Sequence, residues 1–415
     1  MSITIPVSRA APALKRATEG QFDRLDSVLL ITGLALLAIG LVMVTSASIS
    51  VADRNLSSPF YYLQRQAVFI MLGLIAAWLV YQVRLVHWEK SGMALLGFSL
   101  FLLVLVLLPG VGKEVNGSTR WISFGVFNLQ VSEAVKLFLI IYVAGYLVRH
   151  GEIVRTSIWG FIKPMLMVGM AALLLLLEPD FGATVVIIGT VLGMMYLGGV
   201  RFMQFVSFLV LFGTAALMLV VSSPYRMERI TSFMNPWADP FDSGFQLTQS
   251  LIAIGTGGWF GTGLGGSVQK LFYLPESHTD FLFAVLSEEL GFVGVCMIIA
   301  LYSMLFYRAI RIALQAEKCG NRFAAYLAYG IGIWLAMQAV INMGVNMGML
   351  PTKGLTLPLM SYGGSSLIIC CMAIGLLLRI HFECAVYINQ AVSQEDKKKS
   401  AQTRKRRTRR RRAVS

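Results

Sequence analysis

Long apolar runs separated by shorter polar stretches set the pattern of this chain. A helix of roughly 20 mostly apolar residues can cross the hydrocarbon core of a bilayer. Such runs lie at 27–48, 66–84, 91–109, 131–148, 161–177, 181–199, 203–222, 281–307, 323–347 and 363–381. The pattern predicts an all-α polytopic membrane protein with about ten transmembrane helices and a large extracytoplasmic loop between the seventh and eighth.

Three polar interruptions differ from ordinary turns. Segment 223–280 is long and rich in glycine, and within it 245–254 is predicted to form a short interfacial helix. Glu178-Pro179-Asp180 splits one apolar stretch, since proline and two carboxylates disfavour a helix in lipid. Two prolines and three glycines bar a regular helix between Met349 and Ser366. Non-helical backbone at membrane depth requires cover by protein or a cavity, so this segment is predicted to be an outer-leaflet re-entrant segment or a loop.

Composition supports this class. The 415 residues are 56% hydrophobic and only 13% charged, against about a quarter charged in soluble domains. Of the net charge of +14, residues 395–415 supply +9 from eleven Lys or Arg and two acids, which leaves +5 for the rest. The five cysteines have no metal-ligand spacing and are interpreted as core residues. No glycine-rich phosphate loop is visible, which argues against a nucleotide-driven pump.

The Lys and Arg residues of the short loops predict that both termini are cytoplasmic. The chain then divides into a cytoplasmic segment 1–26, a transmembrane domain 27–385 and a disordered basic tail 386–415. The tail is interpreted as an arm that is solvated or bound to anionic membrane lipids, and nucleic-acid binding is not expected. Segments 110–130, 178–182, 223–280 and 348–362 share the outer face.

Asp280 stands where the long loop meets the eighth apolar run. A carboxylate at the membrane edge is costly unless something requires it. Asp280 could cap the helix that follows, or serve as a chemical group, and the two roles are compatible. Beside it lies His278, and no zinc-binding pattern is visible.

Further ionisable residues interrupt the apolar runs. Glu133 and Lys136 share one helix face at i, i+3, either as a structural ion pair or as part of a site. At least one of Glu288 and Glu289 is expected to face the bundle and pair with a cation, in a structural role.

The outer-face segments carry other candidate binding residues. Glu178 and Asp180 could bind a cation through oxygen ligands, or form a solvated turn. Arginines there could bind phosphate by bidentate contacts or meet lipid headgroups. The candidates for substrate binding on this face are Arg120, Arg226, Arg229, Gln246, Gln249, Lys270, His278, Lys353, Ser361 and Ser365.

Several motifs resemble the SEDS family (shape, elongation, division and sporulation), whose members are ten-span cell-wall polymerases of bacteria. The resemblance covers residues 27–385 and is carried by Glu178-Pro-Asp-Phe-Gly182, Pro236 to Gln249, Leu274 to Glu289 and Pro351 to Ser366. The forms at Lys270 to Glu276 and Pro351 to Pro358 look more like the division member than the elongation member. Glu178 departs from the glutamine common at its position, which leaves a metal role for Glu178 open.

The resemblance implies a peptidoglycan glycosyltransferase of the bacterial inner membrane at the division septum. Its substrate would be lipid II, with undecaprenyl pyrophosphate as the leaving group. Asp280 matches the essential acid of the family, and Glu133 and Lys136 match its important ion pair. The implied partners are a class B penicillin-binding protein and other division proteins. No cofactor is firmly expected; a divalent cation (Mg or Mn) is the one candidate, with Glu178, Asp180 and Asp280 as its candidate ligands.

The chemistry agrees with one essential acid. A pyrophosphate leaving group needs neutralisation of its charge rather than protonation, so a single base can suffice where glycosidases use two carboxylates. The alternatives are a lipid II flippase, a division scaffold without activity and an elongation-type polymerase. A flippase needs access from both sides of the membrane, whereas the unusual residues gather on one predicted face.

Overall fold

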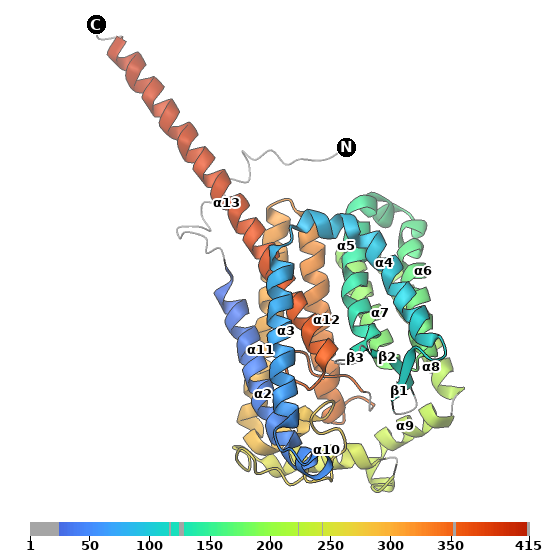
Figure 1. Ribbon diagram of the computed structural model, residues 1–415. Coiled ribbons are helices and arrows are strands. Elements are labelled where there is room, and N and C mark those ends of the chain that lie inside the picture. The colour runs from blue at the N-terminus through green and yellow to red at the C-terminus, as the bar shows by residue number, and fades with distance from the viewer. Residues whose placement is uncertain are drawn as a thin grey trace.

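The computed structural model describes residues 25–115, 118–123, 128–222, 224–242, 244–351 and 354–412. Most of the expected N-terminal segment, together with Lys353, lies outside these ranges. In the described part, ten helices form a bundle whose long axes run roughly side by side (Figure 1). They are α2 (Ser27–Leu56), α3 (Tyr61–Gln82), α4 (Leu85–Leu107), α5 (Val131–Thr156), α6 (Ile158–Leu177), α7 (Phe181–Leu197), α8 (Phe202–Val221), α11 (Leu282–Lys318), α12 (Arg322–Asn346) and α13 (Gly364–Arg412).

These helices match the ten predicted apolar runs in order and position. Eight are long and apolar enough to cross a membrane, and α7 and α8 contribute two shorter apolar helices. The chain is therefore a polytopic membrane protein, and ten crossings stay the prediction. The prediction of a disordered tail is wrong for residues 386–412, because α13 continues to Arg412. No glycine or proline interrupts residues 386–412, so nothing in the sequence breaks the helix.

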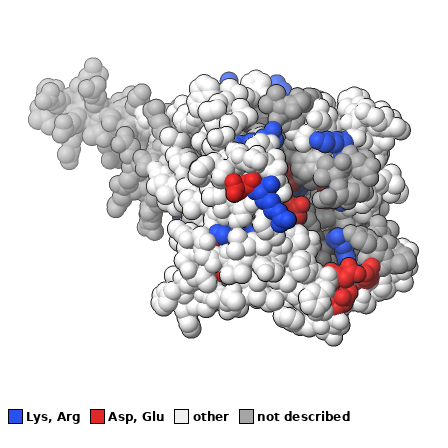
Figure 2. Space-filling view, turned by 60° about the horizontal axis from the view of Figure 1, so that its bottom comes forward, with Lys and Arg blue, Asp and Glu red and all other residues white. Residues whose placement is uncertain are grey.

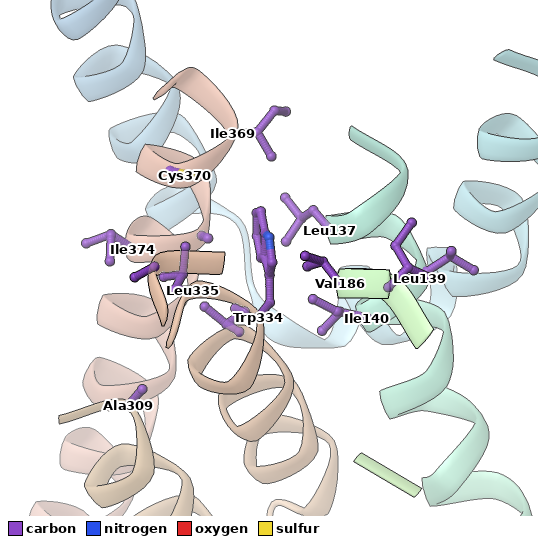
Figure 3. Close-up of a cluster of buried hydrophobic side chains, with 14 of the residues drawn as sticks. Leu137, Leu139, Ile140, Val186, Ala309, Trp334, Leu335, Ile369, Cys370 and Ile374 are labelled. Atoms are coloured by element: carbon purple, nitrogen blue, oxygen red, sulfur yellow. The ribbon is translucent and has the colours of Figure 1, made fainter. Parts of the chain in front are cut away.

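Burial ranks the helices from the centre of the bundle outward. In the most apolar 18-residue stretch of α5, 89% of the residues are buried, against 22% in the corresponding stretch of α3. Helix α5 is therefore central and α3 is peripheral. Trp334 of α12 is fully buried and packs among Leu137 and Ile140 of α5, Val186 of α7 and residues of α13 (Figure 3). The core therefore lies where α5, α7, α12 and α13 meet.

The longer connecting segments gather at one end of the bundle, the lower end in Figure 1, here named the loop end. It carries α9 (Pro224–Met234), the short 3-10 helix η1 (Pro236–Ala238) and α10 (Phe245–Gly257). It also carries an antiparallel sheet in the order β1 (Gly112–Val115), β2 (Ser118–Ser123) and β3 (Asn128–Gln130), which leads into α5. The sequence predicted an outer-face segment at 110–130 without strands, so this small sheet is an addition to the all-α prediction, whereas α10 appears where an interfacial helix was predicted.

The glycine-rich segment after α10 lies against α11 at backbone contact. A Cβ on Gly257 would stand 2.0 Å from the carbonyl oxygen of Ser287, and one on Gly261 would stand 2.1 Å from that of Glu289. Thr262 N–H donates to the carbonyl of Glu288 at 2.9 Å. These glycines are required because any side chain would separate the two backbones.

Two carboxylates of α11 fasten the same segment. Glu288 accepts hydrogen bonds from the Ser267 hydroxyl and from Val268 N–H. Glu289 pairs with Lys270 at 2.7 Å, and both side chains are buried. The expectation that one of the two acids pairs with a cation is confirmed. The ammonium of Lys270, a candidate for substrate binding, instead holds the loop to the bundle.

Candidate active site

Asp280 lies at the loop end, two residues before α11. The cap position of α11 belongs to Phe281, and no side chain caps it, so the interpretation of Asp280 as the helix cap is wrong. The carbonyl oxygen of Asp280 accepts hydrogen bonds from Asn342 Nδ2 at 2.8 Å and Asn346 Nδ2 at 3.0 Å. Its half-buried carboxylate faces Gly354, where an added Cβ would stand 2.9 Å from Oδ2. Two side chains of α12 therefore hold the backbone of Asp280, and the carboxylate lies beside Gly354.

The surroundings of Asp280 favour its protonated form more than water does. Burial raises the pKa of this carboxyl from 3.8 to about 7, and the negative charges of Glu276 and Asp180 add to the rise. The Arg120 guanidinium opposes it. Charged side chains of both signs gather around a hollow on this face of the molecule (Figure 2). Asp280 can therefore take up or release a proton near neutral pH.

The turn between α6 and α7 is held by Arg120 of β2. Its Nε donates to the carbonyl of Glu178 at 3.0 Å, and its Nη2 donates to that of Pro179 at 2.6 Å. Asp180 caps α7 by accepting from Ala183 N–H at 3.1 Å. Both acids of the turn are buried, so the interpretation as a solvated turn is wrong. Burial, with the charge of Asp180, raises the pKa of Glu178 to about 8, so this side chain is a neutral acid at pH 7.

The three candidate metal ligands do not form a metal site. In the described segments, no group of three or more His, Cys, Asp or Glu side chains is arranged to hold an ion. Both oxygens of Glu178 and Oδ2 of Asp180 are buried without a partner among the described residues, which a protonated Glu178 tolerates better than a charged one. These three oxygens fall short of the six or more that hard cations usually require. No chemical step is therefore derived through a metal.

Glu133 and Lys136 form a buried ion pair inside the bundle. Lys136 Nζ lies 2.8 Å from Glu133 Oε1 and donates to Gln338 Oε1 at 2.7 Å. Ser366 donates to Glu133 Oε2 at 3.1 Å and shares a hydrogen bond of 3.0 Å with Thr356. The pair is thus satisfied by α12, α13 and the segment before α13, as a buried pair requires.

A polar stripe on α12 joins this ion pair to Asp280, and sequence reasoning missed it. Trp334, Gln338, Asn342 and Asn346 follow one another at intervals of four, and all are buried. Gln338 Nε2 donates to the carbonyl of Thr356 at 3.0 Å. The signal was available, because amides repeating at helical spacing within an apolar run share one inward face.

The other candidates divide by what surrounds them. The His278 ring packs between Tyr62 and Tyr362, at centroid distances of 4.6 and 5.6 Å, and burial lowers its pKa below 6.5. Ser361 accepts from Leu357 N–H, and Ser365 accepts from Gln130 N–H, so both hydroxyls brace backbone.

The remaining candidates lie on two helices of the loop end. Gln246 and Gln249 are half-buried on α10, and Arg229 is half-buried on α9. Arg226 also belongs to α9, but its side chain, like Lys353, is outside what the structure describes. The charges of Arg120 and Asp180 act on the carboxyls of both Asp280 and Glu178, so these four residues form one group. His278 lies two residues before Asp280 in the chain.

Fold and site together define a polytopic membrane protein with a proton-exchanging carboxyl at one end of its bundle. A family model described as "Cell cycle protein", which covers the FtsW, RodA and SpoVE proteins, matches residues 26–385. The chain belongs to this family, the SEDS family of the sequence analysis.

Relatives of known name agree. A protein of Thioalkalivibrio sulfidiphilus named "Probable peptidoglycan glycosyltransferase FtsW" is 60% identical over 87% of this chain and 90% of its own length. A protein of the same name from Nitrosococcus halophilus is 54% identical over 89% and 95%.

Two solved structures share the fold. One, from work on how a peptidoglycan synthase complex coordinates polymerization and crosslinking, has a TM-score of 0.71 and 33% identity, covering 87% of this chain and 98% of the other. The other is the rod shape determining protein RodA of Thermus thermophilus, with a TM-score of 0.64 and 32% identity over 86% and 96%.

Proposed function

We propose that this glycosyltransferase of the SEDS family polymerises lipid II into glycan strands, with Asp280 as the general base. The observation that carries the proposal is the position of Asp280: its backbone is held by α12, and its half-buried carboxyl has a pKa raised to about 7. A base of this kind is matched to proton abstraction at neutral pH. The names of the relatives support the glycosyltransferase class.

In the proposed reaction, Asp280 takes the proton from a hydroxyl of the acceptor sugar. The resulting oxygen nucleophile attacks the anomeric carbon of the donor, and the bond to pyrophosphate breaks. Attack from the face opposite the leaving group inverts an α-linked donor to a β-linked product. Undecaprenyl pyrophosphate leaves with its negative charge, so no second acid is needed to protonate it.

Cations of the loop end would stabilise the departing pyrophosphate. Arg120 is one candidate, because its positive charge acts on the carboxyl of Asp280. Arg226, Arg229 and Lys353 are the further candidates on this face. Arginine suits the role because its planar group can contact two phosphate oxygens at once.

The polymerase would act in the bacterial inner membrane at the septum, with the loop end outside and both termini in the cytoplasm. Its partner would be a class B penicillin-binding protein that crosslinks the new strands. The relation to a structure from a synthase complex that joins polymerization and crosslinking supports this pairing. Membrane lipids would surround the apolar outer surfaces of the peripheral helices, where side chains such as Trp78 of α3 are exposed.

A glycan-chain gel tests the function directly. Purified protein with its penicillin-binding partner is incubated with lipid II, and wild type is compared with Asp280→Asn and Asp242→Asn. Asp242 is an exposed aspartate of the same outer segment and serves as the matched control. Glycan strands are expected from wild type and Asp242→Asn but not from Asp280→Asn. Strands of normal length from Asp280→Asn would remove the base role.

The same preparation, reconstituted in proteoliposomes, distinguishes the polymerase from a flippase. It would move lipid II between leaflets of proteoliposomes without lengthening it, so transfer without polymer from the wild type would favour transport. Gathering of the ionisable site groups at the loop end argues for chemistry on one side of the membrane.

A further inference from the structure

Two asparagines on successive turns of α12 hold the backbone at Asp280. We propose that Asn342 and Asn346 are positioning residues, whose amides fix the carbonyl of Asp280 and thereby set where its carboxylate meets the acceptor hydroxyl. This inference rests on the proposed base role of Asp280. Both asparagines are buried, at 2% and 0% exposure, so water does not compete for their hydrogen bonds.

Asn342 joins the two segments that enclose the carboxylate. Its Nδ2 donates to the carbonyl of Asp280 at 2.8 Å and also to that of Leu355 at 2.6 Å. Leu355 follows Gly354, the residue that faces the carboxylate from the other side. One nitrogen therefore sets the separation between the acid and the backbone opposite it.

The remaining oxygen of Asn342, Oδ1, is buried and has no hydrogen-bond partner among the described residues. A buried acceptor left in this state costs about 1–3 kcal/mol. This cost opposes the gain from the two hydrogen bonds that the Nδ2 of the same side chain donates to Asp280 and Leu355.

Asn346 holds the same carbonyl from one turn further along α12. Its Nδ2 donates to Asp280 O at 3.0 Å, while its Oδ1 accepts from Ala284 N–H in the first turn of α11 at 3.2 Å. Behind it, Ser250 of α10 donates to the carbonyl of Asn346 at 2.8 Å. The start of α11 is thus fixed to α12 and braced by α10.

The space around the carboxylate shows why its position matters. A methyl group added to Gly354 would stand 2.9 Å from Asp280 Oδ2, so the carboxylate occupies space that only glycine leaves open at this position. A displacement of about 1 Å at a reacting group can lower a rate about 100-fold. Loss of the two amide donors frees the Asp280 carbonyl, and the carboxylate moves with it.

Replacing each asparagine by aspartate tests the proposal, because aspartate has nearly the shape of asparagine but cannot donate the hydrogen bond from Nδ2. Asn346→Asp keeps an acceptor for Ala284 N–H but replaces the donor to Asp280 O with an oxygen. Asn342→Asp does the same to both of its carbonyl partners, and Asn342→Ala removes the donors without adding charge. We expect kcat for lipid II polymerisation to fall about 100-fold in all three, with KM close to that of wild type.

Asn321→Ala is the matched control. Asn321 caps the opposite end of the same helix through Ala324 N–H, and losing a cap costs about 1 kcal/mol without touching the site. We expect it to lower the melting temperature while kcat stays near wild type. The Asn342 and Asn346 variants should show a loss of kcat larger than their melting temperatures explain.

Two results would overturn the inference. One is near-normal kcat in folded Asn342→Ala and Asn346→Asp. The other is a loss of kcat that is no larger, for a given fall in melting temperature, than the loss in Asn321→Ala. If Asp280→Asn is inactive while the asparagine variants are active, only the positioning role fails. If Asp280→Asn is itself active, the proposed function fails first.

Discussion

Asp280 differs from an ordinary surface aspartate in its burial and in the charges around it. Burial is the largest cause of its raised pKa, and Glu276 adds to it while Arg120 opposes it. A base must be deprotonated before it can accept a proton, so a raised pKa narrows the pH range in which the enzyme works. It also makes the carboxylate a stronger base than a free aspartate.

The first prediction concerns this pH range. Polymerisation should fall as the pH drops below about 7, approaching a tenfold loss per pH unit, because the fraction of ionised Asp280 falls by that factor. Initial rates at saturating lipid II between pH 5.5 and 9 measure it. Glu276→Gln removes one negative neighbour, so it should lower the pKa and move the fall in rate to lower pH. A rate that stays flat to pH 5.5 would contradict the account.

Among the connecting elements, the glycine-rich segment depends on contact with α11 rather than on flexibility. Gly261 and Gly263 both have positive φ, at 79° and 90°, so alanine is strained at either. Only at Gly261 would the new Cβ meet backbone, since nothing lies within 4 Å of the one on Gly263. The two positions separate the effect of contact from that of backbone strain.

The second prediction uses this pair. Gly263→Ala should lower the free energy of unfolding by about 1 kcal/mol, from strain alone. Gly261→Ala should cost clearly more, because the loop must move away from α11. Thermal unfolding in detergent measures both. Equal losses at the two positions would show that the tight contact between the loop and α11 does not matter.

The third prediction concerns the buried ion pair. Lys136→Met leaves Glu133 charged and unpaired in the core, which should cost about 3–5 kcal/mol of unfolding free energy. Adding Glu133→Gln removes the stranded charge and should restore much of the loss. A double-mutant cycle in detergent measures the coupling. A double variant less stable than Lys136→Met would contradict the pair as described.

Helices were the most predictable elements, since each apolar run is long and its polar ends are distinct. The non-helical backbone of 354–361 was also predictable, from Gly354 and Pro358, and Leu357 and Met360 in this segment are buried. The sheet at 112–130 was not, because strands of three to six residues carry too few alternating positions. Nor could spacing along the chain reveal that Lys270 meets Glu289 rather than the site, because that pairing depends on how the loop folds back.

Over the whole molecule, the segments that carry Arg120, Glu178, Asp180 and Asp280 lie at the loop end, whereas the last turns of α13, which contain the basic tail, project from the opposite end of the bundle (Figure 1). This separation fits an enzyme that works on one membrane face. The distribution of Lys and Arg predicts that this face is outside.

Side-specific labelling tests the orientation as the fourth prediction. A single cysteine is placed at Asp242 in a cysteine-free background and compared with native Cys319, at the turn between α11 and α12. A membrane-impermeant maleimide applied to spheroplasts should label Asp242→Cys at once and Cys319 only after permeabilisation. The reverse pattern would place Asp280 in the cytoplasm and rule out synthesis of an external polymer.

The most direct measurement is the rate of forming the first glycosidic bond at saturating lipid II, in wild type and in Asp280→Asn with the partner present. Loss of a general base predicts a fall in kcat of about 10²–10⁴-fold, with KM little changed. Folding of the variant is checked by its melting temperature. A folded Asp280→Asn that forms this bond within a few-fold of the wild-type rate would contradict the assignment of Asp280 as the base.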